Sequence, residues 1–134
     1  MRVATKAHAW LYRKTGGRLL SQVGGQPVLL LTTTGRRTGV PRTTPVQFMR
    51  SGERLVLVAA NGGAPVAPAW LGNLVATPRA SVRVGRDVVD VRARIAEGAE
   101  RDKLWTELVA TNGRLAQTEQ RARRRLPVVV LEPS

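Results

Sequence analysis

An arginine-rich segment is the first feature of this sequence with residue types suited to ligand chemistry. Residues 35–42 read Gly-Arg-Arg-Thr-Gly-Val-Pro-Arg and follow an apolar run. The glycines let the backbone approach an anion closely, and the guanidinium groups and the hydroxyl can bond to phosphate or carboxylate. The segment has neither the Gly-Lys-Ser/Thr of a Walker loop nor the GxGxxG of a dinucleotide-binding loop. It is therefore interpreted as an anion-binding loop, with a solvated basic turn as the alternative.

A glycine pair followed by the start of a helix forms the second candidate. Residues 61–65 read Asn-Gly-Gly-Ala-Pro, and residues 68–74 read Pro-Ala-Trp-Leu-Gly-Asn-Leu. Backbone amides at a strand end, together with a helix N-terminus, can hold a ligand. The indole of Trp70 has the shape to flank a flat ring, and packing of Trp70 in the core is the alternative.

The residue types present exclude several kinds of catalysis. The chain has 134 residues, which is room for one domain, and it contains no cysteine. Disulfides, thiolate metal sites and cysteine nucleophiles are therefore excluded, and the single histidine, His8, cannot build a histidine-rich metal site. No metal site is predicted and no catalytic residue is identified. If the protein is an enzyme, we expect a bound cofactor to supply its reactivity.

The charge balance predicts an anionic partner. Lysine and arginine total 22 against 9 acidic residues, a net charge of +13. Most of these cations are arginines, which suit phosphate and carboxylate. A phosphorylated cofactor, a nucleic acid and an anionic membrane are all anionic partners of this kind. Alternatively, the excess of arginine reflects only the codon usage of a GC-rich genome. Aromatic residues make up only 4% of the chain, so a nucleic-acid-binding module, which would use aromatic stacking, is disfavoured.

The hydrophobic pattern predicts the elements that position these clusters. Strands are expected at 27–33, 45–50, 54–60, 81–84, 87–95 and 126–131, and helices at 68–76, 100–112 and 114–125. Hairpin turns are expected at Ser51-Gly52 and Gly85-Arg86. In the strand 87–95, one face is expected to be apolar, with Val89, Val91, Ala93 and Ile95. Strands joined largely by hairpins predict a mainly β (α+β) fold, an antiparallel sheet curled into a small barrel.

Residues 1–15 are predicted to form a separate amphipathic helix before a single barrel domain at 16–134. Val3, Ala7, Trp10 and Leu11 share one helical stripe. This helix could pack on the core, line a ligand pocket or make peripheral contact with a membrane. No apolar run approaches the roughly 18 residues that cross a bilayer. With no export signal, a cytoplasmic protein is expected.

Several motifs, taken in order along residues 10–133, carry a family resemblance. They are residues 29–39, Pro41-Arg42, Pro45, residues 62–65, Pro68-Ala69-Trp70, Asn73-Leu74, Arg124 and residues 127–129. In this pattern the chain resembles the deazaflavin-dependent nitroreductase family of actinobacteria. The resemblance implies a split β-barrel related to FMN-binding oxidoreductases. It also implies the cofactor coenzyme F420, an 8-hydroxy-5-deazaflavin with a phosphate and a polyglutamate tail, and FMN on the same barrel is the alternative.

The resemblance also implies roles for individual residues. The phosphate and the acidic tail would contact Arg36, Arg37, Thr38 and Arg42. The deazaflavin would lie along Pro45, Val46 and Gln47. The other side of the cofactor site would consist of Asn61, Gly62, Gly63, Trp70, Asn73 and Leu74.

The implied activity is hydride transfer from reduced F420 to a small-molecule acceptor that is quinone-like, nitroaromatic or another activated unsaturated compound. A non-catalytic barrel that sequesters F420 or an apolar ligand is the alternative from another class. The sequence leaves the oligomeric state open, a homodimer included.

The chain departs from the family pattern after the strand 54–60, where a hydroxyl and a cation near the cofactor are lost, and also around Trp70 and near the C-terminus. Ala60 and Asn61 replace a Ser-Lys pair, and Thr118 and Ala122 replace a Tyr and a Thr. Around the tryptophan, a His and a Tyr-His pair are replaced by Ala67 and Leu71-Gly72. These changes predict fewer hydrogen-bond donors around the acceptor.

Overall fold

The computed structural model describes residues 22–23 and 26–134, so the helix predicted at residues 1–15 lies outside the described part of the chain. The described residues form one antiparallel sheet of eight strands. The strands are β1 (Gln22–Val23), β2 (Gln26–Thr34), β3 (Pro41–Gln47), β4 (Met49–Ser51), β5 (Arg54–Val58), β6 (Arg79–Val84), β7 (Asp87–Ile95) and β8 (Val128–Pro133).

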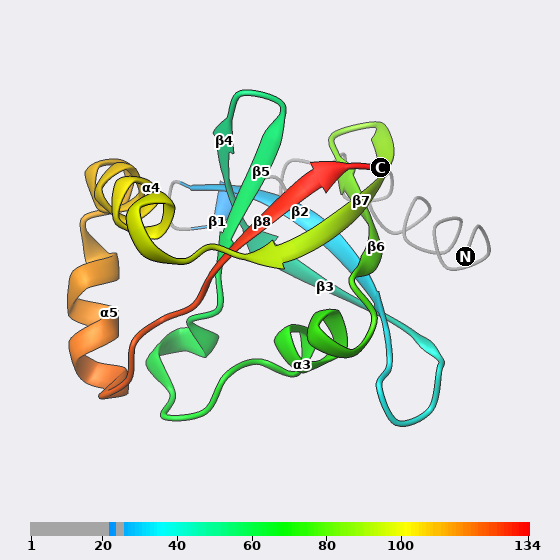
Figure 1. Ribbon diagram of the computed structural model, residues 1–134, viewed down its shortest axis with the longest axis horizontal. Coiled ribbons are helices and arrows are strands. Elements are labelled where there is room, and N and C mark those ends of the chain that lie inside the picture. Colours follow the sequence, from blue (N-terminus) through cyan, green and yellow to red (C-terminus); the bar gives the residue numbers. More distant parts are fainter. Residues whose placement is uncertain (1–21, 24–25) are drawn as a thin grey trace.

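The sheet curls because β3 and β4 are two halves of one stretch of chain. Only Phe48 separates them, yet β3 pairs with β2 whereas β4 pairs with β5. Between β2 and β5, the strand order runs through β6, β7 and β8. The two ends of the sheet are therefore joined through the stretch 41–51, which confirms the predicted antiparallel barrel (Figure 1).

Three α-helices and one 3-10 turn accompany the sheet in the described part of the chain. They are η1 (Asn61–Gly63), α3 (Ala69–Ala76), α4 (Gly98–Thr111) and α5 (Arg114–Ala122). In Figure 1, α4 and α5 lie together at the left of the sheet, and α3 lies at its lower edge beside the β2–β3 loop. None of these helices is long and apolar enough to span a membrane.

The strands β5 and β8 are buried on both faces, which explains why their sequences are continuous apolar runs. One face of each strand joins the barrel interior, through Leu55, Leu57, Val129 and Leu131. The opposite face packs against α4 and α5, in a cluster of Val56, Val128, Val130, Leu104, Leu108 and Leu115. The helices are thus fixed on the outer surface of the barrel, beside the strand that ends before Asn61.

The predicted hairpins are confirmed, and the turn residues explain them. Ser51 pairs with Arg54 around Gly52, and Val84 pairs with Asp87 around Gly85. Gly52 has a φ of 63° and Gly85 a φ of 59°, a region that glycine adopts without the steric cost of a Cβ atom.

Three details of the predicted strands were wrong. Pro41 and Arg42 belong to β3 rather than to the loop, and the strand expected at 45–50 is interrupted at Phe48. Proline is compatible with the first position of a strand because its missing N–H is then not needed for pairing. On β7, Val89 and Ile95 are 36% and 42% exposed, because the barrel interior reaches only the middle of this long strand.

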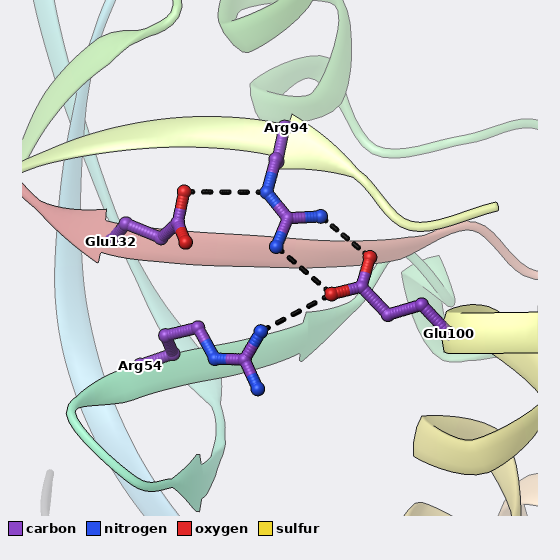
Figure 2. A network of polar contacts seen from close by, with 4 residues as sticks. All are labelled: Arg54, Arg94, Glu100 and Glu132. Atoms are coloured by element: carbon purple, nitrogen blue, oxygen red, sulfur yellow. Dashed lines mark hydrogen bonds and ion pairs between the residues drawn. The ribbon is translucent and has the colours of Figure 1, made fainter.

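The first turn of α4 is attached to the sheet by a network of four charged side chains (Figure 2). Arg94 donates to Glu100 from Nη1 at 2.6 Å and from Nη2 at 2.9 Å, and Arg54 Nη1 donates to Glu100 at 3.2 Å. Arg94 Nε also donates to Glu132 at 3.3 Å. The hydrogen bonds from Arg94 hold the pKa of Glu100 below its ordinary value. The network therefore links α4 to β5, β7 and β8.

Candidate active site

The β2–β3 loop and the start of α3 enclose a cleft of about 590 Å³, called here the basic compartment. Its lining includes Arg36, Arg37 and Arg42, and no residue with a carboxylate belongs to it among the described residues. The remaining residues of the lining are Thr33, Gly35, Thr38, Thr44, Asn61, Pro68, Ala69, Trp70 and Asn73. Three cations without a local counter-charge favour an anionic ligand.

The β2–β3 loop is shaped by its own hydrogen bonds. Gly35 N–H donates to the carbonyl of Val40 at 2.9 Å, and Gly39 N–H donates to the carbonyl of Gly35 at 2.7 Å. Thr38 Oγ1 accepts a hydrogen bond from Val40 N–H at 3.1 Å. These bonds leave Arg37 projecting from the exposed tip of the loop. Within residues 26–134, the guanidinium groups of Arg37 and Arg42 have no hydrogen-bond or ion-pair partner.

Arg36 is held by α3 and is not free in this way. Its Nη1 donates to the carbonyl of Ala69 and to Asn73 Oδ1, both at 3.1 Å, and its backbone N–H donates to the same Oδ1 at 3.1 Å. Asn73 Nδ2 in turn donates to Thr33 Oγ1 at 3.1 Å. Asn73 is only 4% exposed, and both polar atoms of its side-chain amide form hydrogen bonds within the protein.

A second cavity of about 320 Å³ lies beside the first and is called here the uncharged compartment. In the part of the chain that the structure describes, its lining has no ionisable side chain. The lining residues are Thr44, Pro45, Val46, Gln47, Phe48, Met49, Val56, Val58, Ala60, Asn61, Gly62, Pro68, Trp70, Leu108, Thr111, Asn112 and Leu115. Thr44, Asn61, Pro68 and Trp70 line both compartments, so the two meet at these residues. Together they can hold a ligand with one anionic end and one flat apolar end.

Most of the predicted site residues lie in these compartments. Arg36, Arg37, Thr38, Arg42 and Asn73 line the basic compartment. Pro45, Val46, Gln47 and Gly62 line the uncharged compartment. Asn61 and Trp70 line both, and Trp70 also packs in part against the barrel interior.

Gly63 and Leu74 line neither compartment. Gly63 has a φ of 87°, and a Cβ atom there would lie 2.9 Å from Nε of Arg121 on α5. Leu74 is 4% exposed and belongs to the barrel interior. A direct contact of either residue with a ligand stays a prediction.

Arg124 fixes the glycine-containing segment that separates β5 from α3. Its Nη2 donates to the carbonyls of Ala59 and Ala60, each at 3.1 Å, and its Nε donates to the carbonyl of Ala64 at 3.2 Å. A further bond joins Nη2 to the carbonyl of Val66 at 3.2 Å. One guanidinium therefore satisfies four carbonyls of a segment with little regular structure of its own.

The contribution of α4 and α5 to the site could not be assigned from the sequence. Leu108, Thr111, Asn112 and Leu115 all line the uncharged compartment. Leu108 belongs to a helical stripe that is typical of core packing, and the signal available for Thr111 and Asn112 is their place at a helix end before Gly113.

Among the departures from the family pattern, Ala60 and Asn61 line the uncharged compartment. The linings of both compartments exclude Ala67, Leu71, Gly72, Thr118 and Ala122. The hydroxyl of Thr118 donates to the carbonyl of Arg114 at 2.9 Å within α5.

No group of three or more histidine, aspartate or glutamate side chains in residues 26–134 is arranged to hold a metal ion.

Comparison with known proteins agrees with this geometry. The model of the F420H(2)-dependent quinone reductase family matches residues 4–133. An F420H(2)-dependent quinone reductase of Mycobacterium tuberculosis is 37% identical over 130 residues, which cover 94% of this chain and 87% of that protein. The solved structure of an F420-H2 dependent reductase is similar with a TM-score of 0.72 and 34% identity, over 79% of this chain and 94% of that chain.

Two further solved structures are similar. One is described as a domain-swapped dimer and matches with a TM-score of 0.74 and 31% identity, over 94% of this chain and 99% of that chain. The other is the heme storage protein HutZ of Vibrio cholerae, with a TM-score of 0.59 and 15% identity, over 80% of this chain and 81% of that chain, a likeness of fold alone.

The barrel, the order of the motifs and the match over nearly the whole chain agree with one another. The resemblance inferred from the sequence is confirmed, and so is its reading as an F420-dependent oxidoreductase family. This chain belongs to the F420H(2)-dependent quinone reductase family.

Proposed function

We propose that this protein binds F420 across the two compartments and that the uncharged compartment receives a quinone as hydride acceptor. One observation on residues 26–134 carries the proposal: a compartment lined by three arginines and no carboxylate meets, at Trp70, a compartment lined by no ionisable side chain. F420 has the same division, since its phosphate and glutamate tail are anionic and its deazaflavin ring is flat and uncharged over most of its surface.

The residues of the basic compartment fit the anionic part of this cofactor. Arg36, Arg37 and Arg42 would hold the phosphate and the carboxylates through charge-assisted hydrogen bonds. Because Arg37 and Arg42 are exposed, they can follow a tail of variable length, whereas Arg36 is fixed against α3. Part of the binding free energy is then electrostatic and weakens with salt.

The residues around Trp70 fit the ring. Pro45, Val46 and Gln47 would lie along one side, and Trp70 and Gly62 would close the other. Reduced F420, when bound, supplies a hydride. The role of this chain is to hold ring and acceptor together and to exclude water, which lowers the barrier through proximity.

The uncharged compartment suits a neutral, flat acceptor such as a quinone. Leu108, Leu115 and Phe48 offer apolar contact, and Asn112 lies among them as a polar group. Asn112 Oδ1 accepts a hydrogen bond from Arg114 N–H at 3.2 Å. The Nδ2 group of Asn112 lies at the other end of the amide and takes no part in that bond. This donor can serve an oxygen that becomes negative during hydride transfer.

Fluorescence titration of the full chain with F420 and with FMN, at low and high salt, tests the proposal. We expect tighter binding of F420, weakening as salt rises, and oxidation of reduced F420 when a soluble quinone is added. Equal or tighter binding of FMN would overturn the cofactor assignment. Binding of F420 without turnover of any acceptor would instead support a sequestering protein.

We also propose that the protein is a homodimer, as supported by the similar structure described as a domain-swapped dimer. Light scattering after size exclusion would test this, and a single monomeric species at micromolar concentration would contradict it. The predicted cytoplasmic location and membrane contact through residues 1–15 stay predictions, which flotation of the full chain with anionic vesicles would examine.

A further inference from the structure

We infer that Asn73 and Gly72 are positioning residues that fix the guanidinium of Arg36 before any anion binds. The inference deepens the proposed function, because it rests on the basic compartment being the site of the anionic end of the ligand. It changes the role of Asn73 from a direct ligand contact to a support that acts through Arg36.

Asn73 fixes Arg36 through both ends of its buried amide. Oδ1 accepts from the backbone N–H of Arg36 and from Nη1, each at 3.1 Å, so it constrains the loop and the side chain together. Nδ2 donates to Thr33 Oγ1 at 3.1 Å at the end of β2, which anchors the amide to the sheet. Every polar atom of the Asn73 side chain is thereby engaged with the protein.

Gly72 supplies the space that this arrangement needs. A Cβ atom at position 72 would lie 2.9 Å from Nη1, 3.0 Å from Cζ and 3.1 Å from Nε of Arg36. Distances this short force the guanidinium to move, because they lie well inside ordinary van der Waals contact. The absence of a side chain at Gly72 therefore lets Arg36 lie against α3.

The fixed guanidinium still has donors for an anion. Nη1 is satisfied by the carbonyl of Ala69 and by Asn73 Oδ1. Nε and Nη2 have no partner among the described residues, and together they form one bidentate fork. Since Arg36 is held in place beforehand, binding costs less side-chain entropy at this position than at Arg37 or Arg42. Arg36 then sets where the anion lies, and Arg37 and Arg42, which have no such bonds among the described residues, adapt to the rest of it.

The variant Gly72→Ala separates positioning from stability. Alanine favours a helix interior over glycine, so we expect the melting temperature to be kept or raised while the dissociation constant for F420 rises about tenfold. Gly113→Ala is the matched control, because a Cβ atom there meets nothing within 4 Å. It should leave both quantities unchanged.

A double-mutant cycle then tests whether the effect passes through Arg36. Arg36→Ala alone should weaken F420 binding, and adding Gly72→Ala should weaken it no further. Additive effects of the two substitutions would overturn the inference, as would unchanged F420 affinity in Gly72→Ala. Asn73→Asp keeps the acceptor for Arg36 but brings a negative charge, so it should also weaken binding.

A measurement on the ligand-free protein keeps this inference separate from the proposed function. Nitrogen-15 relaxation of arginine Nε–H groups should show Arg36 ordered and Arg37 and Arg42 mobile in the wild type, with Arg36 mobile in Gly72→Ala. A mobile Arg36 in the wild type would overturn the inference whether or not F420 binds. Failure of the wild type to bind F420, with Arg36 ordered, would overturn the proposed function alone.

Discussion

Nη2 of Arg124 lies 3.1 Å from the carbonyl oxygen of Ala59, a residue 65 positions earlier in the chain. The same guanidinium also bonds to the carbonyls of Ala60, Ala64 and Val66. The segment that carries Asn61 and Gly62 is therefore held in place by a side chain that lies after α5. The positions of Gly62 and of the end of α5 are coupled through these bonds.

Replacement of Arg124 tests this coupling. Arg124→Met keeps most of the side-chain volume but leaves the carbonyls of Ala59 and Ala64 without a donor among the described residues. The carbonyls of Ala60 and Val66 keep their bonds from Gly63 N–H and Asn61 Nδ2. The free energy of unfolding should fall by about 2 kcal/mol. Affinity for F420 should fall as well, because Gly62 is no longer fixed. Arg125→Met, at a side chain that is 68% exposed, is the control for loss of charge. Urea unfolding and F420 titration measure the two effects, and equal effects at both positions would contradict the structural role.

The free arginines of the basic compartment should contribute to affinity and not to folding. Arg37→Ala or Arg42→Ala removes a charge-assisted bond to an anion, which costs about 1.5–3 kcal/mol, or roughly tenfold to a hundredfold in F420 affinity. Circular dichroism should show a folded protein in each case. Arg86→Ala, at the exposed turn between β6 and β7, should bind F420 normally. If Arg37→Ala and Arg42→Ala do so too, the β2–β3 loop is only a solvated turn.

Acid should weaken the attachment of α4. Hydrogen bonds from Arg94 lower the pKa of Glu100 in the folded state, so its contribution to stability is present above the unfolded pKa and is lost as pH falls through the folded one. The contribution is modest, because the side chains of Glu100 and Arg94 are 34% and 40% exposed. Glu100→Gln should lower the melting temperature at neutral pH, and the loss should shrink as pH falls through the lowered pKa of Glu100. Glu97→Gln, at an exposed neighbour, is the control and should change the melting temperature little at neutral or acidic pH. If Glu100→Gln lowered the melting temperature equally at neutral and acidic pH, the ion pairs of Glu100 would not contribute to stability.

Asn112 should influence the acceptor and spare the cofactor. Asn112→Asp keeps the oxygen that Arg114 N–H contacts but removes the Nδ2 donor and places a negative charge in the uncharged compartment. Charge that develops on a quinone oxygen is then opposed, so turnover should fall on the order of tenfold at unchanged F420 affinity. Gln120→Glu adds the same charge on the exposed side of α5 and serves as the control. Unchanged turnover in Asn112→Asp would place the quinone elsewhere.

Quinones should be better acceptors than nitroaromatic compounds. Reduction of a nitro group places developing negative charge on oxygen, and preorganised donors usually stabilise such charge. Ala60 and Asn61 stand where the family pattern has a Ser-Lys pair, and the hydroxyl of Thr118 is bonded within α5. A quinone is reduced more easily and can take its proton from water. Steady-state rates with a soluble quinone and a nitroimidazole under matched conditions compare the two, and a faster nitro reduction would show that other donors replace the missing ones.

Those parts of the fold that depend on local patterns could be predicted from the sequence. Apolar runs of strand length, separated by glycine turns, predicted the two hairpins. Pro68 before α3 and Pro78 after it predicted the bounds of that helix. The interruption at Phe48 could not be predicted, because it depends on which distant strands pair with the two halves. Which strand pairs with which is decided when the sheet closes, and the residues around Phe48 carry no pattern that indicates it.

The same distinction applies to the candidate site. The composition of residues 35–42 was enough to predict that Arg37 and Arg42 face one cleft, which both residues line. Their anion-binding role stays a prediction. The sequence could not show that Leu74 is buried in the barrel interior, because only the rotation of α3 against the sheet decides that. Nor could it show that Gly63 lies against Arg121, since that contact depends on where α5 packs.

The position of β8 constrains the order in which the barrel can assemble. The hairpins β2–β3, β4–β5 and β6–β7 join neighbours in the chain, so their loops close at little entropic cost. Strand β8 pairs with β5 on one side and β7 on the other, and it lies far from β5 in the sequence. Until it docks, β5 and β7 present unpaired edges, which are prone to associate with other chains. Slow, nonlocal closure by β8 is therefore the stage at which refolding competes with aggregation.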